Sequence, residues 1–236
     1  MMHTRIFATS VPKSGTHFLT QIFNGMGYNL QASRKYDKYG LDIRLLDEKF
    51  RNAEHACIYG HWRYNAQSAQ DLAEYDYKII CLIRDPRDIC LSMADYILRG
   101  SPRGAHESEP GLRSLTKREA IIATIKGFGL PNFKSKSIDK VCEGWLDWKN
   151  AGGIVLKYED IITSVANQSP IATLQQVRVR PTEFLNSATS EYQSTKSATM
   201  NVGKAARWRS EFDDELSTIW NERAEGVATA WGYEET

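Results

Sequence analysis

The sequence predicts an α/β fold with three layers, in which a mostly parallel central sheet is flanked by helices. Three observations predict it. Short apolar runs alternate along the chain with stretches of helical periodicity, which is the pattern of βαβ units. The run Tyr77–Ile83 (YKIICLI) is almost continuously apolar, as expected of a central parallel strand covered on both faces. The length of 236 residues is one that a single α/β domain reaches, so one domain over residues 1–236 is expected.

Composition and charge exclude several classes of protein. Lys and Arg number 30 and Asp and Glu number 29, so the formal net charge is +1. No global attraction to nucleic acid or to an anionic membrane is therefore expected, and any anion site must be local. The hydrophobic share of 42% and the charged share of 25% are ordinary for a globular domain. These values argue against a disordered chain, collagen or a coiled-coil rod.

Cysteine spacing and hydropathy indicate the compartment. The four cysteines are scattered without a CxxC pair, and the five histidines show no zinc spacing, so neither a disulfide scaffold nor a metal site is predicted. No apolar run approaches the ~18 residues of a membrane helix. The N-terminus lacks the apolar core of ~7–15 residues that a signal peptide requires. We therefore expect a cytoplasmic protein without a membrane span.

The first half of the chain predicts two strand-and-turn units. A strand over residues 5–11 leads into the turn Pro12-Lys13-Ser14-Gly15 and then a helix from Thr16 to about Met26. Apolar residues recur at helical spacing in that helix, and Gly27 marks its C-terminal end. A second strand over residues 55–59 ends at Gly60-His61-Trp62.

The next unit begins with the strand Tyr77–Ile83 and continues as a helix to about Leu98. Asp85 suits the N-cap of that helix, Pro86 its first position and Asp88 its positive start. Further along, a strand is predicted over residues 153–158 and a helix over residues 214–231. Loops are predicted over residues 33–39, 100–111 (a lid) and 186–200.

Two segments carry candidate chemistry. In the first, a glycine turn opens a helix, which offers backbone N–H groups and the positive end of the helix dipole to a phosphate or sulfate. Lys13 precedes Gly15 there, whereas the lysine of a Walker A loop follows its last glycine. In the second, Arg84 ends a strand and Ser92 lies two turns into the following helix. An ordinary turn and an ordinary helix cap remain alternatives for each segment taken alone.

Together the segments resemble the PAPS-dependent sulfotransferase family, whose members transfer a sulfuryl group from 3′-phosphoadenosine 5′-phosphosulfate (PAPS). PKSGTHF at residues 12–18 is similar to the family's PKSGTTW loop, and RDPRDICLS at 84–92 to its R-[ND]-P-[KR]-D-x-x-x-S element. Gly60-His61-Trp62 resembles the catalytic-histidine segment. LKYED at 156–160 resembles the YED element, and GKAARWR at 203–209 resembles RKGxxGDWK. The five elements occur in family order and span most of the chain.

The resemblance implies a P-loop-NTPase-like sulfotransferase fold, a single sulfotransferase domain over residues 1–236 and an enzyme that uses PAPS and releases 3′-phosphoadenosine 5′-phosphate (PAP) without a metal. It implies His61 as the general base, Lys13 as the residue that stabilises the leaving group, and Ser92 as the residue that restrains Lys13. The nucleotide-binding residues that it implies are Lys13, Ser14, Gly15, Thr16, His17, Phe18, Arg84, Ser92, Tyr158, Gly203, Lys204 and Arg207.

The sequence departs from the family pattern at several positions. Asn201 and Val202 stand where the family has Arg-Lys, so the second contact to the 3′-phosphate is weaker or moves to Lys204 or Arg207. Phe18 replaces a tryptophan that stacks on adenine, and a phenylalanine offers less ring area.

The expected partner is a small-molecule acceptor with a hydroxyl group: a phenol, an alcohol, a lipid or a sugar. An amine acceptor stays open, as does the oligomeric state, and no nucleic-acid partner is expected. Residues 33–50 and 100–133 are expected to line the acceptor pocket.

Two other functions remain open at the level of sequence. The first is a P-loop phosphotransferase that depends on a metal, in which Asp85 would serve as a Walker B acid. The second is a nucleotide-binding module without catalysis. Turnover of ATP with magnesium would favour the first, and binding without transfer would favour the second.

Overall fold

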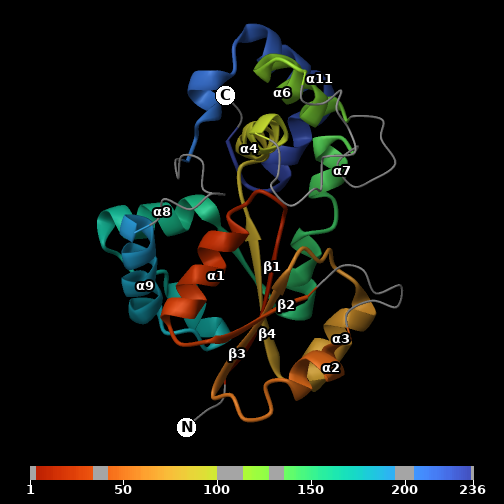
Figure 1. Ribbon diagram of the computed structural model, residues 1–236. Helices are drawn as coiled ribbons and strands as arrows, with labels where there is room; N and C mark the ends of the chain where they lie inside the picture. Colours follow the sequence, from red (N-terminus) through yellow and green to blue (C-terminus); the bar gives the residue numbers. More distant parts are fainter. Residues whose placement is uncertain (1–3, 34–41, 100–113, 128–135, 195–204, 235–236) are drawn as a thin grey trace. The chain divides into compact units, whose positions relative to one another are not determined.

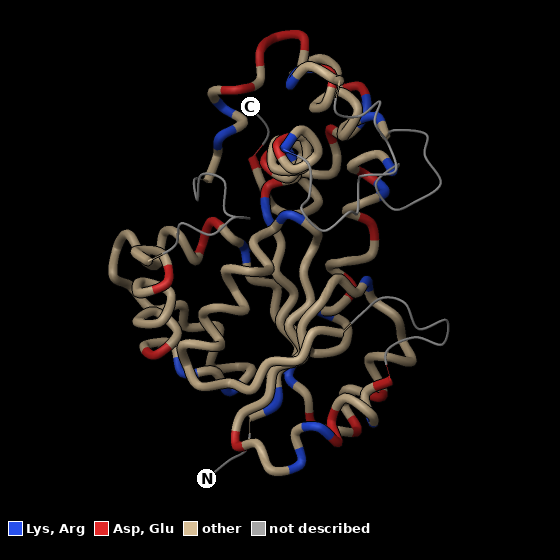
Figure 2. The backbone as a smooth tube through the Cα atoms, in the orientation of Figure 1, with Lys and Arg blue, Asp and Glu red and all other residues tan. Residues whose placement is uncertain are grey.

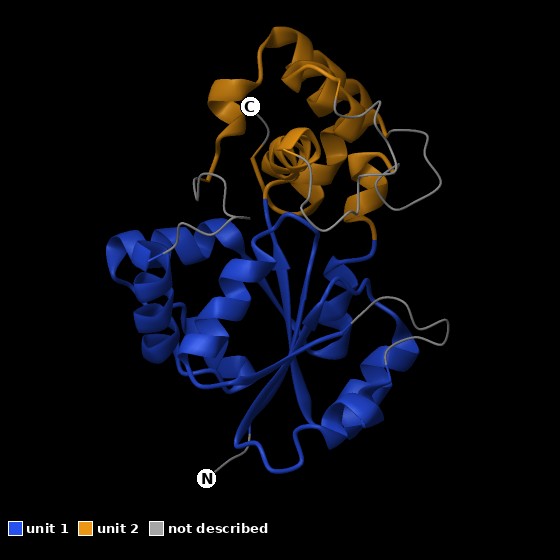
Figure 3. Cartoon of the chain, in the orientation of Figure 1, with its two compact units in different colours: residues 1–84, 144–203 blue, residues 85–143, 204–236 orange. Residues whose placement is uncertain are grey.

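The computed structural model describes residues 4–33, 42–99, 114–127, 136–194 and 205–234 (Figure 1). They form two compact units (Figure 3). The first unit comprises residues 1–84 and 144–203 and contains the sheet, and the second comprises residues 85–143 and 204–236 and is helical. A single domain over residues 1–236 stays a prediction.

Among the described residues, the sheet of the first unit has five strands in the order β2-β3-β1-β4-β5, and every neighbouring pair is parallel. The predicted α/β fold with its parallel sheet is therefore confirmed. β4 has the predicted bounds, and β2 is a short edge strand that the sequence analysis did not predict. The strands are β1 (Thr4–Ser10), β2 (Asn29–Ala32), β3 (His55–Gly60), β4 (Tyr77–Ile83) and β5 (Ile154–Lys157).

Helices cover both faces of this sheet (Figure 1). On one face lie α1 (Thr16–Gly25), α8 (Tyr158–Asn167) and α9 (Pro181–Ser194), with the 3₁₀ helix η3 (Ala172–Val177); on the other lie α2 (Ile43–Glu48), α3 (Ala66–Glu74) and the 3₁₀ helix η2 (Leu146–Ala151). Successive side chains of β1 point to opposite faces of the sheet, because a strand has a two-residue period. Ile6 and Ala8 join the core under α1, whereas Phe7 packs on Trp148 of η2 with ring centroids 5.4 Å apart.

Charged residues of the sheet stay near its ends. Arg5, Lys78 and Lys157 each lie within two residues of a strand end. The middle positions of the strands carry no Lys, Arg, Asp or Glu (Figure 2). The interior positions are instead filled by fully buried apolar side chains such as Ile58 and Ile80. The charged side chains of the sheet therefore lie only at the two edges where the strands begin and end.

The helices in the described part of the second unit are α4 (Pro86–Arg99), α6 (Lys117–Lys126), α7 (Ile138–Cys142), α10 (Trp208–Glu211) and α11 (Asp214–Ala230). α4 begins as predicted: the Asp85 carboxylate accepts a hydrogen bond from the backbone N–H of Arg87 at 2.9 Å, and Asp88 lies in the first turn. In the part of the chain that the structure describes, no helix has the length and apolar character needed to cross a membrane.

One predicted loop is wrong in part. Residues 186–194, expected as a polar loop, form the second half of α9. Phe184, Leu185 and Ala188 are buried on one side of this helix. The polar Ser, Thr and Asn residues that suggested a loop lie between and after them in the sequence. The lid expected at 100–111, most of the loop at 33–39 and residues 195–200 lie outside the described residues.

An ion pair in the second unit predicts how stability depends on pH. Hydrogen bonds from the Arg118 guanidinium, together with one from the backbone N–H of Leu216, lower the pKa of Asp213 to about 2. Because this value lies below the ~3.9 of an unfolded chain, the stabilisation is present above about pH 4 and is lost as the pH falls towards 2.

Asp213→Asn should therefore destabilise the protein at pH 7, since asparagine keeps the N-cap hydrogen bond to Leu216 but loses the charge. Urea unfolding of both proteins at pH 7, 4 and 3 measures the difference, which should shrink with falling pH. A difference that stays constant across this range would contradict the assignment. Arg51→Gln, which breaks an exposed ion pair with Glu48 in the first unit, is the matched control.

Candidate functional site

The candidate residues of the first unit gather at one edge of the sheet. All five strands are parallel, so their carboxyl ends meet at the same edge. β1 lies between β3 and β4, where the strand order reverses, and ligands of open α/β sheets bind outside the carboxyl ends at such a point. Lys13, His61, Arg84 and Tyr158 follow β1, β3, β4 and β5 respectively.

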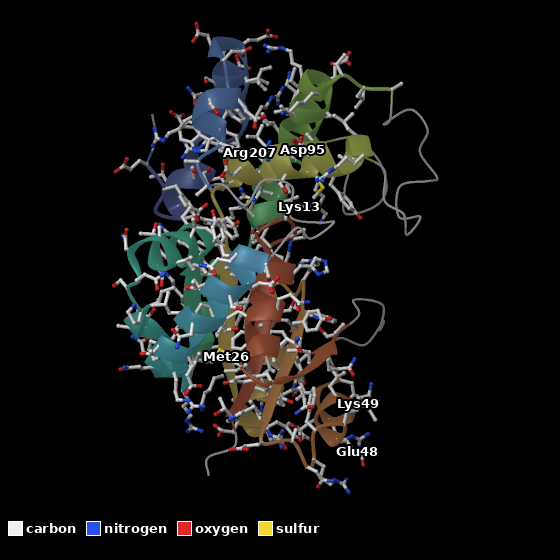
Figure 4. The ribbon with its side chains drawn as sticks, turned by 60° about the vertical axis from the view of Figure 1, so that its left-hand side comes forward. Lys13, Met26, Glu48, Lys49, Asp95 and Arg207 are labelled. Carbon is white, nitrogen blue, oxygen red and sulfur yellow. The ribbon has the colours of Figure 1, made fainter. Side chains whose placement is uncertain are left out.

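The loop after β1 is shaped to receive an anion. Lys13 and Gly15 have positive φ angles of 72° and 98° on either side of Ser14, whose N–H donates to the Val11 carbonyl at 3.1 Å. α1 starts without a side-chain cap and without an acidic residue in its first turn. Its first N–H groups and its dipole therefore face the loop, where they favour negative charge. Lys13 lies just before α1 (Figure 4).

A buried hydroxyl group in this loop also points to a ligand. Ser14 is fully buried, and its Oγ has no hydrogen-bond partner among the residues that the structure describes. A buried polar group left in this state costs about 1–3 kcal/mol. An oxygen atom of a bound phosphate or sulfate would satisfy this hydroxyl.

Tyr158 forms the wall behind the loop. A Cβ atom added to Gly15 would lie 2.7 Å from Tyr158 Cδ2, so only glycine fits here, quite apart from its φ of 98°. On another side, the Arg84 guanidinium carbon lies 4.7 Å from the centroid of the Tyr158 ring, which is a cation–π contact. Tyr158 and Arg84 are both buried. The tyrosine thus holds Gly15 and Arg84 in place.

An aromatic cluster continues from this wall. Phe18 is buried, and its ring lies edge-on to Tyr158 and to Tyr192 with centroids 6.2 and 6.4 Å apart. That Phe18 stacks on adenine stays a prediction. Tyr192, on α9, is 39% exposed, and the sequence analysis missed it. It continues the helical spacing of Leu185 and Ala188, a signal that would have found it.

The hydrogen bonds of His61 favour one position of the proton on its ring. His61 Nδ1 lies 2.8 Å from the Ser10 carbonyl oxygen. A carbonyl can only accept, so this contact favours the tautomer with the hydrogen on Nδ1 and the lone pair on Nε2. The next residue is held as well: Trp62 N–H donates to Thr9 Oγ1 at 2.9 Å, and that hydroxyl donates to the Trp62 carbonyl at 2.7 Å. His61 itself is exposed, so its imidazole is oriented yet accessible.

Two further loop residues differ in their surroundings. Thr16 Oγ1 lies 2.6 Å from Ser10 Oγ, so the first residue of α1 is joined to the end of β1. His17 is exposed, and its carbonyl accepts from Thr20 Oγ1 at 2.9 Å. A role for the His17 ring in nucleotide binding stays a prediction.

Asp85, the candidate Walker B acid, is engaged with Arg87. Its Oδ1 accepts from the Arg87 backbone N–H and from Nε, each at 2.9 Å, and its Oδ2 accepts from Nη2 at 2.8 Å. Both side chains are buried. A carboxylate bound through both oxygens to a neighbouring guanidinium fits the helix-cap interpretation better than that of a metal ligand.

The remaining candidates lie in the second unit or outside the described residues. Ser92 is half-buried on α4. Arg207 Nη2 donates to Asp95 at 3.0 Å and to Glu211 at 2.7 Å, and Figure 4 shows the Arg207 and Asp95 labels side by side. A phosphate could bind Arg207 only by sharing or replacing these partners. Gly203 and Lys204 lie outside the described residues.

Searches of protein-family models and of curated proteins find no match to the sequence. Solved structures do match. Mouse sulfotransferase SULT7A1 complexed with PAP is 19% identical, with a TM-score of 0.62 over 98% of this chain and 88% of that chain. Retinol dehydratase in complex with retinol and PAP is 14% identical, with a TM-score of 0.56 over 96% and 82%. Retinol dehydratase with androsterone and inactive cofactor PAP is 13% identical, with a TM-score of 0.60 over 96% and 81%. The chain therefore has the sulfotransferase α/β fold, as the resemblance implied.

Proposed function

We propose that this protein is a sulfotransferase that moves a sulfuryl group from PAPS to a hydroxyl acceptor and releases PAP. The observation that carries the proposal is the loop after β1, where the buried Ser14 hydroxyl and the uncapped N-terminus of α1 offer donors to an anion. PAP in each of the three similar structures named above supports the choice of nucleotide. The oriented imidazole of His61 supports catalysis over mere binding.

In the proposed binding mode, different segments of the protein bind different groups of the nucleotide. The backbone of residues 13–16 with Ser14 and Thr16 binds the 5′-phosphosulfate, and His17 lies next to it. Arg84, a buried guanidinium suited to bidentate contact, binds the 3′-phosphate. By the sequence resemblance, Ser92 and residues 203–207 (with Gly203, Lys204 and Arg207) contribute to this phosphate. The aromatic residues Phe18, Tyr158 and Tyr192 are proposed to form the adenine side of the site.

The proposed reaction is an in-line displacement at sulfur. The acceptor oxygen forms a bond to sulfur as the bond from sulfur to the bridging phosphate oxygen breaks. His61 Nε2 takes the proton of the acceptor hydroxyl. Lys13 stabilises the charge that grows on the bridging oxygen, and loop N–H groups hold the other oxygens. Ser92 is proposed to restrain Lys13 before the acceptor arrives.

The acceptor is proposed to be a small hydroxyl compound. Retinol and androsterone, named in the similar complexes, are both alcohols, which supports this class. The segments expected to line its pocket lie largely among residues 34–41, 100–113 and 128–135, outside the described residues. A panel of phenols, alcohols, lipids and sugars is the corresponding screen.

Calorimetric titration with PAP, beside ATP with magnesium, tests the proposed function. The wild type should bind PAP tightly without a metal, and Arg84→Ala should weaken binding by about 10- to 150-fold, as expected when a charged hydrogen-bonding group worth 1.5–3 kcal/mol is lost. Arg178→Ala, which removes an exposed arginine paired with Asp76, is the control and should bind normally. A preference for ATP with magnesium would instead favour the phosphotransferase function.

A further inference from the structure

We propose that Ser10 is a positioning residue that links the anion-binding loop to His61, so that an anion at the N-terminus of α1 fixes the proton on His61 Nδ1. The inference rests on the proposed function, because it gives the bound nucleotide a second effect at the same site. Three residues take part: His61, Ser10 and Thr16. None of the motifs that identified the site contains Ser10.

The contacts form an unbroken chain. His61 Nδ1 lies 2.8 Å from the Ser10 carbonyl and 3.4 Å from Ser10 Oγ. Ser10 Oγ lies 2.6 Å from Thr16 Oγ1, and either hydroxyl can be the donor of that bond. Ser10 is 1% exposed at the end of β1, so its own polar atoms are shielded from water. The chain runs from the exposed imidazole to the first residue of α1.

A bound anion would select one direction for these hydrogen bonds. Each hydroxyl has a single hydrogen to donate. If Thr16 donates to an oxygen of the anion, its hydrogen is used, and Ser10 must donate to Thr16 Oγ1. Ser10 Oγ then presents only lone pairs to His61 Nδ1, as the Ser10 carbonyl already does. The imidazole must keep its hydrogen on Nδ1, which leaves Nε2 as the base.

Without an anion, both directions are open. Thr16 can donate to Ser10 Oγ, and the Ser10 hydrogen is then able to point at His61 Nδ1 and oppose the tautomer that the carbonyl favours. The backbone contributes the same carbonyl in either case, because Ser10 is fixed in register with Leu82 of β4. Among these hydrogen-bonding groups, the Ser10 hydroxyl is therefore the one that responds to the ligand.

The test is NMR spectroscopy of the full-length protein labelled with ¹⁵N-histidine. Two-bond ¹H–¹⁵N spectra distinguish Nδ1–H from Nε2–H, and His61→Gln assigns the signals. On adding PAP, wild-type His61 should move towards the Nδ1–H form. In Ser10→Ala this response should fall to less than half, while calorimetry shows PAP affinity within about threefold of the wild type. Ser10→Thr, which keeps the hydroxyl, should restore the response.

A control and a second variant keep the test decisive. Ser33→Ala removes another hydroxyl that holds the same loop, through Trp62 Nε1 at 2.6 Å, and should leave the response unchanged. Thr16→Val breaks the pair from its other end and replaces Ser10→Ala if that variant does not fold. An undiminished His61 response in both variants would overturn the inference.

Absence of PAP binding by the wild type would contradict the proposed function instead. Inorganic sulfate then serves as the probe of the loop in the same spectra. A His61 response to sulfate that requires Ser10 would support the link, and a response that does not, or no response, would overturn it.

Discussion

His61→Ala should lower sulfuryl transfer by about 10²- to 10⁴-fold, the range that general-base catalysis contributes. The Ser10 carbonyl holds Nδ1–H at 2.8 Å, so Nε2 is the nitrogen that can accept the acceptor's proton. Alanine removes that base. The measurement is transfer of labelled sulfate from PAPS to the first hydroxyl compound that the wild type sulfates, with both proteins at saturating PAPS.

Folding and nucleotide binding should persist in this variant. His61 is exposed and lies outside the hydrophobic core, and PAP affinity should stay within about threefold of the wild type. His55→Gln is the matched control, because His55 lies at the opposite end of the same strand, where it stacks on Tyr28. Near-normal turnover by His61→Ala would remove the base from the mechanism.

Local patterns sufficed to predict the elements that have a distinct sequence signature. β4 was predicted with its observed bounds because its apolar run stops at Arg84 on one side and Asp76 on the other. β2 has no such signature: its four residues, NLQA, are partly exposed and pair with one neighbour only. Its existence depends on the edge that β3 presents, which no local pattern encodes.

The site likewise has features that the sequence predicts and features that it does not. The loop after β1 and the positions of His61 and Arg84 could be predicted because each follows an apolar strand, and parallel strands bring their carboxyl ends to one edge. The hydrogen-bonding partners of these residues could not be predicted from the sequence. That the Ser10 carbonyl orients His61 depends on the register between β1 and β3, in which Thr9 lies opposite Gly60.

Arg207 shows most clearly which contacts the sequence cannot predict. As part of GKAARWR it was predicted to bind phosphate, and its charge alone is consistent with that. The structure pairs it with Glu211, one helical turn away, and with Asp95, which precedes it by 112 residues. The first partner could have been found from i,i+4 spacing, and the second only from the packing of α4 against α10.

Lys13→Ala should lower transfer by about 10²- to 10³-fold, the loss typical when one preorganised donor to a developing charge is removed. Lys13 follows β1 with a left-handed backbone, φ 72°, in the loop that opens α1. Negative charge grows on the bridging oxygen mainly in the transition state. The loss should therefore appear in kcat, with a much smaller change in the KM for PAPS.

Two further variants separate charge from shape. Lys13→Arg keeps the positive charge and should retain more activity than Lys13→Ala, whereas Lys13→Met, with similar length and no charge, should be as slow as alanine. Lys78→Ala, at the opposite end of β4 from the site, is the control and should behave as the wild type. If Lys13→Ala raised KM and left kcat unchanged, Lys13 would bind the ground state and the transition-state role would be wrong.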